Sequence, residues 1–67
     1  RGVGDLLLDA VERWAARGGA ELLRLGVFEG NEHALALYRR RGFLPTGRIR
    51  RELPDGRRDM ELVKRLR

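Results

Sequence analysis

The segment AELLRLGVFE, residues 20–29, limits the folds that the rest of the chain can complete. Its side chains alternate as in a β-strand, with Leu23, Leu25 and Val27 on one apolar face and a partly apolar face opposite. A strand that is apolar on both faces usually lies inside a sheet that is covered on both sides. We therefore expect this strand to have a neighbour on each edge, which requires more strands than the chain supplies.

Helical patterns lie on both sides of this strand. Residues 3–16 have apolar side chains at helical spacing, and Gly18-Gly19 follows as a natural helix end. The apolar positions are Val3, Leu6, Leu7, Ala10, Val11, Trp14 and Ala15, with Asp5, Asp9, Glu12, Arg13 and Arg17 on the other side. A second helix is predicted from about Asn31 to Arg41, and Gly42 would end it.

Two further strands are predicted at residues 43–53 and 57–66. They are joined by PDG, in which Pro54 presets its own φ and Gly56 accepts a positive one, so they form a hairpin. The crossover through the second helix makes its two strands parallel, and the hairpin makes the last strand antiparallel. The predicted fold is therefore α/β, in the order α-β-α-β-β with a mixed sheet.

Composition limits how such a chain is stabilised. It has 67 residues, which is one small domain at most, and no cysteine, so neither a disulfide nor a cysteine-bound zinc ion can stabilise it. Its stability must therefore come from its core or from a partner. A net charge of +5 favours acidic partners such as phosphorylated ligands.

No spacing typical of metal ligands is present, so no metal is expected. No apolar stretch of roughly 18 residues and no charged leader are present, so we expect a cytoplasmic protein that does not bind membranes.

The sequence RGVG, residues 1–4, precedes the first predicted helix. Glycines let the backbone approach a ligand closely, and the unpaired N–H groups of a first helical turn attract phosphate. Alone the motif is weak, because two glycines before a helix more often form a tight turn. Asp5 favours the helix but would repel a phosphate beside it. Since Arg1 is not a methionine and no element precedes the glycines, we interpret the chain as a fragment of a longer domain.

In the second predicted helix, Asn31, Ala34 and Tyr38 fall within a sector of roughly 60°. A structural role explains each of them, since Asn31 can cap the helix, Ala34 favours it and Tyr38 can pack with a wet hydroxyl. In a functional role, Ala34 leaves room for a ligand and Tyr38 donates its proton. A phenol has a pKa of about 10, so it is protonated at neutral pH and can protonate a thiolate, which suits acyl transfer from a thioester.

The charged residues of this helix are expected to point away from that sector. His33, the only histidine, is expected in solvent, because no carboxylate or serine stands at an orienting spacing. The chain has three arginine-rich runs, at residues 39–41, 48–51 and 57–58, and Arg40 belongs to the first. We expect the arginines to be mostly in solvent, although they could form one basic surface.

These features resemble the C-terminal half of the GCN5-related N-acetyltransferase (GNAT) family. RGVG followed by LLLDAVERWA resembles the end of the family's acetyl-CoA pyrophosphate loop and the helix after it. NEHALALYRRRGF, residues 31–43, matches the family's signature N-x-x-A-x-x-L-Y-x-x-x-G-F at every fixed position. The resemblance implies that residues 1–67 are the C-terminal portion of a single acetyltransferase domain, in which a terminal β-hairpin completes the sheet and its last strand lies between the two earlier ones.

The resemblance also implies an activity and a site. An acetyl group would pass from acetyl-CoA, the cosubstrate, to a primary amine, with Tyr38 as the general acid that protonates the departing thiolate. The residues implied in binding acetyl-CoA are Gly2, Val3, Gly4, Asp5, Asn31 and Ala34. Arg39 to Arg41 are candidates for contact with the adenosine 3′-phosphate. The general base and the strand that polarises the thioester carbonyl would lie before Arg1.

Two other interpretations remain open on the sequence. The first is a small basic module that binds nucleic acid, but the aromatic residues are scattered and form no stacking surface, so nucleic acid is not the expected partner. The second is a catalytically silent chain that forms a homodimer, or exchanges strands, through the exposed edge of its sheet.

Overall fold

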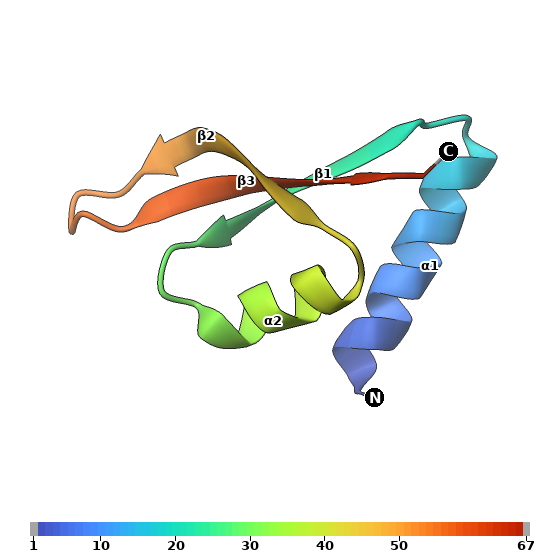
Figure 1. Ribbon diagram of the computed structural model, residues 1–67, viewed down its shortest axis with the longest axis horizontal. Helices are drawn as coiled ribbons and strands as arrows, with labels where there is room; N and C mark the ends of the chain where they lie inside the picture. Colours follow the sequence, from blue (N-terminus) through green and yellow to red (C-terminus); the bar gives the residue numbers. More distant parts are fainter. Residues whose placement is uncertain (1, 67) are drawn as a thin grey trace.

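The computed structural model describes residues 2–66, which form two helices and three strands in the predicted order (Figure 1). The helices are α1, Val3–Arg17, and α2, Glu32–Arg40. The strands are β1, Leu22–Phe28, β2, Leu44–Glu52, and β3, Arg58–Arg65. Both helices lie on the same side of the sheet (Figure 1). The predicted α/β class and the order of the elements are therefore confirmed.

Local signals start and end the helices as the sequence predicts. At the start of α2, Oδ1 of Asn31 accepts a hydrogen bond from the N–H of Ala34 at 3.2 Å. Gly19 after α1 has a φ of 86°, and Gly42 after α2 has a φ of 94°. Glycine adopts this left-handed conformation without steric cost, so each helix stops where the chain supplies one.

The sheet has the strand order β1-β3-β2, and β3 pairs antiparallel with both neighbours. β1 and β2 run in the same direction, as the crossover predicts, but they are not adjacent. The last strand lies between the two earlier ones, as the resemblance implies, so every strand pair within residues 2–66 is antiparallel although β1 and β2 run in the same direction. The cause is the hairpin, which returns β3 into the space between the two parallel strands.

β1 lies at an edge of the sheet that residues 2–66 form, so the second neighbour that its two-sided apolar pattern predicts is not among these residues. Its face with Leu23, Leu25 and Val27 is nonetheless the one turned toward the helices and the core. Because the described chain has three strands and β3 occupies one side of β1, no strand remains to pair with the other side.

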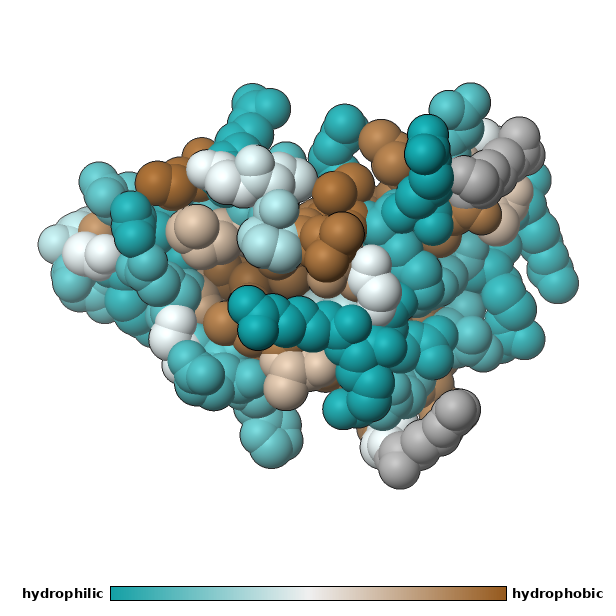
Figure 2. All heavy atoms as spheres, in the orientation of Figure 1, coloured by the Kyte–Doolittle hydropathy of each residue, from teal (hydrophilic) through white to brown (hydrophobic). Residues whose placement is uncertain are grey.

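The core is a small cluster of Val27, Phe43 and Leu62, of which Phe43 is fully buried. These residues come from β1, from the position just before β2, and from β3, and they lie on the side of the sheet that the helices cover. The partly buried apolar residues around it are Leu8, Leu23, Leu25, Ala34, Leu35, Tyr38 and Met60. Three strands and two helices cover this core only in part, and the molecule measures 38 × 25 × 16 Å. In Figure 2, apolar side chains reach the surface in the middle of the view.

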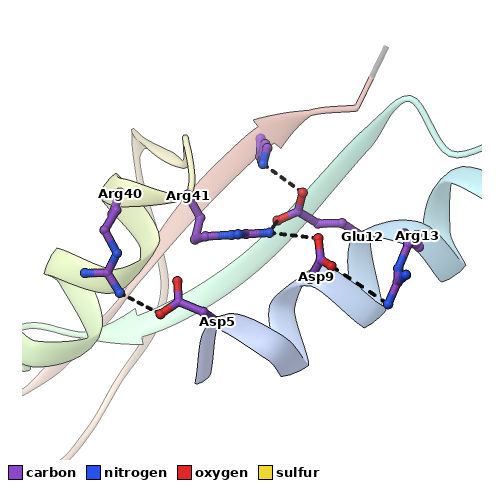
Figure 3. Close-up of polar contacts among 7 residues, drawn as sticks. Asp5, Asp9, Glu12, Arg13, Arg40 and Arg41 are labelled. Atoms are coloured by element: carbon purple, nitrogen blue, oxygen red, sulfur yellow. Dashed lines mark hydrogen bonds and ion pairs between the residues drawn. The ribbon is translucent and has the colours of Figure 1, made fainter. Parts of the chain in front are cut away.

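α1 turns its acidic side toward the rest of the molecule. Asp5 and Ala15 are its buried residues, and its carboxylates face α2 and β3 (Figure 3). Much of the predicted apolar stripe is exposed instead, with 77% of Trp14 and 72% of Val3 accessible to solvent. Charge pairing therefore orients this helix more than burial of its apolar stripe does. Within residues 2–66, neither helix is long and apolar enough to cross a membrane.

Candidate functional site

A groove of about 500 Å³ lies between the N-terminal turn of α1 and α2. Its lining residues are Gly2, Gly4, Asp5, Asn31, His33, Ala34, Ala36, Leu37 and Arg40. Five of the six residues predicted to bind a ligand are among them, although they come from two helices that are separated by a strand. The sixth, Val3, is exposed and does not line the groove.

Close contact between the helices shapes one wall of this groove. A Cβ atom placed on Gly4 would lie 3.0 Å from Cδ2 of Leu37, which is tighter than ordinary side-chain packing allows. Gly2 has open space where a side chain would be. The first glycine therefore leaves the backbone accessible, and the second lets α1 approach α2.

Backbone donors at the start of α1 border the groove. The N–H groups of Asp5 and Leu6 both donate to the carbonyl of Gly2, at 3.2 and 3.4 Å. The amides of Val3 and Gly4 come before these bonds, so they are first-turn donors without an intrahelical acceptor. They lie at the positive end of the helix dipole, where an anion is stabilised.

Asp5 is the buried charge at this end of the groove, with a side chain that is 7% exposed. Its Oδ2 accepts a hydrogen bond from Nη2 of Arg40 at 2.8 Å, and the Gly2 N–H lies 3.5 Å away (Figure 3). The hydrogen bond from Arg40 lowers the pKa of Asp5 most, burial opposes this shift, and the Gly2 N–H lowers the pKa further. The carboxylate is therefore ionised and paired, so its negative charge in the groove is offset.

Three further ion pairs extend from the groove along α1. Arg41 lies 3.2 Å from Asp9 and 3.7 Å from Glu12, and Glu12 also contacts Nζ of Lys64 on β3 at 2.7 Å (Figure 3). Arg41 and Glu12 are mostly buried, at 18% and 14% exposure of their side chains. Arg41 is therefore committed to joining α1 to α2, and Arg40 is the arginine of this run that faces the groove.

Tyr38, the predicted general acid, lies outside the lining of the groove. It is half-buried and packs edge-on against Phe43, with the ring centroids 5.8 Å apart and the rings at 64°. Its hydroxyl makes no hydrogen bond with any side chain or backbone group of residues 2–66 that the structure records. The sector shared by Asn31, Ala34 and Tyr38 is therefore divided, with the first two lining the groove and the third against the core.

His33 is exposed, as the sequence interpretation expected, but both His33 and Arg40 also line the groove, where that interpretation did not place them. The row His33, Leu37 and Arg40 follows helical spacing and faces α1. A signal for this row was present in Gly4, which marks where another backbone or side chain approaches closely. The sequence does not say which side of α2 that approach uses.

The other charged surface of the molecule is separate from this groove. Arg24, Arg48 and Arg50 surround Glu61 and Ile49 in a shallow depression over the sheet. The arginines of the chain therefore do not form one continuous basic surface, since Arg40 and Arg41 are paired with acidic residues of α1. Within the part of the chain that the structure describes, no group of three or more His, Asp or Glu side chains could hold a metal ion.

Comparison with known proteins gives one match. Residues 1–43 match the family model that is described as the acetyltransferase (GNAT) family. The matched residues include α1, β1 and α2, and with them every residue that lines the groove. No curated protein and no solved structure gives a significant match.

Proposed function

The chain belongs to the acetyltransferase (GNAT) family, and from this premise we propose that it transfers an acetyl group from acetyl-CoA to a primary amine. The observation that carries the proposal is the groove between the start of α1 and α2, which combines accessible backbone, first-turn amides with no acceptor among residues 2–66, and a buried carboxylate paired with Arg40. We assign this groove to the pyrophosphate and pantetheine of acetyl-CoA.

Each end of the groove has chemistry that suits one part of this cosubstrate. The amides of Val3 and Gly4 would donate to the pyrophosphate at the positive end of α1. Arg40 offsets the charge of Asp5, so a phosphate placed there would not face an unpaired carboxylate. Asn31 and Ala34 line the opposite side, where an amide side chain and a small residue leave space for the pantetheine arm.

Tyr38 supplies the proton in this proposal. Acetyl-CoA provides the activated thioester, and the nitrogen of the amine forms a bond to its carbonyl carbon while the carbon–sulfur bond breaks. Tyr38 then donates its hydroxyl proton to the departing thiolate sulfur, the nitrogen releases one proton to solvent as the amide forms, and solvent returns a proton to the Tyr38 phenolate. Its contact with Phe43 supports this role by restricting the ring, and the hydroxyl has no partner within residues 2–66 that would compete for its proton.

Binding of CoA to the labelled chain tests the site directly. In amide NMR spectra we expect CoA to shift the resonances of Val3 and Gly4, whereas pantetheine, which lacks the pyrophosphate, should leave them in place. Resonances of the distant turn at Asp55 and Arg57 serve as the internal control. A titration that saturates without moving the α1 amides would refute this binding site.

A pair of variants tests the same groove by filling it. Ala36 is exposed and lines the groove, so Ala36→Phe should weaken CoA binding at least tenfold, or about 1.4 kcal/mol. Glu32→Phe is the matched control, because Glu32 is exposed on the same helix but outside the groove. Calorimetric titration measures both affinities, and an equal effect of the two variants would contradict the assignment.

A further inference from the structure

The face of the sheet opposite the helices carries a distinct set of side chains. Both helices, and with them the groove, lie on one side of the sheet (Figure 1). The core-facing residues of β1 are on that side, so the residues that alternate with them, Arg24, Gly26 and Phe28, face the other. Their partners in β3 share this face, and they include Glu61 opposite Gly26 and Asp59 opposite Phe28. We call this surface the polar face.

The charge of the polar face, and not the number of strands in the chain, is the reason that it contacts water or a polar ligand. Charged side chains are almost never fully buried unless they are paired. Arg24 is exposed, and Asp59 and Glu61 are partly exposed. An apolar segment that packed there would remove these charges from water at a high cost in free energy. The polar face is therefore suited to a polar occupant.

Gly26 makes room for charged side chains on the polar face. A Cβ atom on Gly26 would lie less than 3.0 Å from Oδ1 of Asp59 and from Nη1 of Arg50, which is closer than real side chains approach. The φ of Gly26 is not positive, so the backbone itself does not require glycine. Glycine is needed because an acidic and a basic side chain meet above this point of β1.

A depression of about 420 Å³ borders this point. Its lining residues are Arg24, Arg48, Ile49, Arg50 and Glu61. Glu61 is the cross-strand partner of Gly26, and its Oε1 accepts a hydrogen bond from Oγ1 of Thr46 at 3.0 Å. Neither Arg24 nor Arg48 forms an ion pair within residues 2–66, so both guanidinium groups are available to an anion.

Other arginines near the polar face are already engaged. The guanidinium carbons of Arg51 and Arg57 lie 5.9 and 5.6 Å from the ring centre of Phe28. Arg58 forms an ion pair with Glu29. The depression, rather than the hairpin, is therefore the part of this face that is suited to an anion.

The charges around the depression favour one negative charge on the ligand. Three arginines line it, and the two carboxylates of Glu61 and Asp59 lie beside them, which leaves one positive charge. A carboxylate matches this balance and is bound by arginine through two parallel hydrogen bonds. A doubly charged phosphate would be repelled more strongly by Glu61 and Asp59. Asp59 lies beside Arg50, but a carboxylate has about four lone-pair sites, so it can also accept a bond from a ligand.

We propose that the polar face binds the acceptor of the acetyl transfer, and that this acceptor is a small primary amine that also carries a carboxylate. The inference rests on the proposed function, because that reaction is what requires an amine. The carboxylate of the acceptor binds Arg24 and Arg48, and its amine donates a hydrogen bond to Asp59 beside Gly26. The amine is neutral when it reacts, so the acceptor then has the single negative charge that the site balances.

The position of the polar face also suits the reaction. In the proposed function CoA and Tyr38 occupy the helix side of the sheet, so an acceptor on the opposite side does not compete with them for space. The nitrogen gains positive charge as it bonds to the carbonyl carbon, and the carboxylate of Asp59 stabilises that charge before the proton leaves to solvent.

Two probes of equal length test the acceptor class. β-Alanine carries an amine and a carboxylate, and β-alaninamide has an uncharged amide in place of the carboxylate. In amide NMR spectra of the labelled chain we expect β-alanine to shift the resonances of Arg24 and Gly26, and to bind at least about tenfold more tightly than β-alaninamide. Equal affinities of the two probes, or no shift on the polar face, would overturn the proposal.

Two variants separate the ends of the acceptor. Arg48→Gln should weaken β-alanine at least about tenfold and leave β-alaninamide unchanged, whereas Asp59→Asn should weaken both probes alike. Arg17→Gln is the matched control, because Arg17 is exposed at the end of α1 and forms no ion pair within residues 2–66. Circular dichroism checks that each variant is folded. Equal effects of Arg48→Gln and Arg17→Gln would show that net charge alone attracts the probe, and would overturn the site.

The same spectra distinguish this proposal from the proposed function. CoA should shift Val3 and Gly4 and β-alanine should not, because the two ligands bind on opposite sides of the sheet. A chain that responds to CoA but not to β-alanine would retain the proposed function and overturn the acceptor class. A chain that responds to β-alanine alone would support the polar face as a site for amino carboxylates and refute CoA binding in the groove.

Discussion

At the scale of single residues, the groove depends on how Asp5 is neutralised. A carboxylate beside the first-turn amides satisfies the helix but opposes an anionic ligand. Arg40, which lies far from it in the sequence, resolves this conflict with one hydrogen bond of 2.8 Å. The pair offsets the charge of Asp5 at the start of α1, where we propose that the pyrophosphate binds.

Asp5→Asn should alter the pH dependence of stability. The pKa of Asp5 is lowered in the folded chain, so the unfolded state binds its proton first as the pH falls. The stabilisation is complete above the unfolded pKa of about 3.9 and is lost as the pH drops below it toward the folded pKa. Urea midpoints should therefore favour the natural chain at pH 7, and the difference should shrink below about pH 4. A constant difference down to pH 2 would contradict this.

Tyr38→Phe isolates the hydroxyl, because the ring that contacts Phe43 is retained. We expect kcat for acetyl transfer to fall by about 10²–10⁴, the usual contribution of a positioned general acid, with CoA affinity and stability unchanged. Release of CoA can be followed with a thiol reagent, since the chain contributes no thiol of its own. Full turnover by the variant would remove Tyr38 from the mechanism.

At the scale of elements, adjacent glycines at the end of α1 have different roles. Gly18 has a φ of −78°, which any residue adopts, and an added Cβ would meet only ordinary contacts at 3.6 and 3.8 Å. Gly19 has a φ of 86°, where side chains are strained. The sequence identifies the pair as a helix end, and the backbone shows that the second glycine turns the chain into β1.

The two glycines can be compared by the same substitution. Gly19→Ala should lower the free energy of unfolding by about 1–2 kcal/mol, the cost of a side chain in the left-handed conformation. Gly18→Ala should be neutral or stabilise by up to about 1 kcal/mol, because it restricts the unfolded chain. Urea unfolding of both variants measures the difference, and equal effects would show that helix termination does not depend on Gly19.

At the scale of the whole molecule, stability rests on a core of three buried side chains. A chain of 67 residues is expected to unfold with about 3–10 kcal/mol in total. Leu62 is 2% exposed at the centre of the sheet, between both neighbouring strands. The free energy lost by creating a single cavity at Leu62 is therefore large compared with the total free energy of unfolding.

Leu62→Ala should cost about 2–5 kcal/mol and leave much of the chain unfolded at room temperature. Leu44→Ala is the matched control, because Leu44 is 66% exposed on β2 and its loss should change stability by no more than about 0.5 kcal/mol. Thermal unfolding followed by circular dichroism measures both. Similar losses for the two variants would mean that the core is not where the structure places it.

The sequence by itself determined the elements of this protein. Periodicity located both helices and all three strands, and the positions of Asn31, Gly19 and Gly42 set where helices begin and end. These signals are local, since each depends on neighbours within one turn or one strand pair. The motifs within those elements also indicated the family, and they named most of the residues that line the groove.

Tertiary structure alone decided how these elements face one another. It set the register of β3 against β1 and β2, whose order the resemblance to the family had already implied. Ion pairs of Asp5 and Glu12 with distant partners turned the acidic side of α1 inward and brought Arg40 into the groove. Such contacts join residues far apart in the chain, and the helical periodicity of each segment is the same whichever side meets its neighbour.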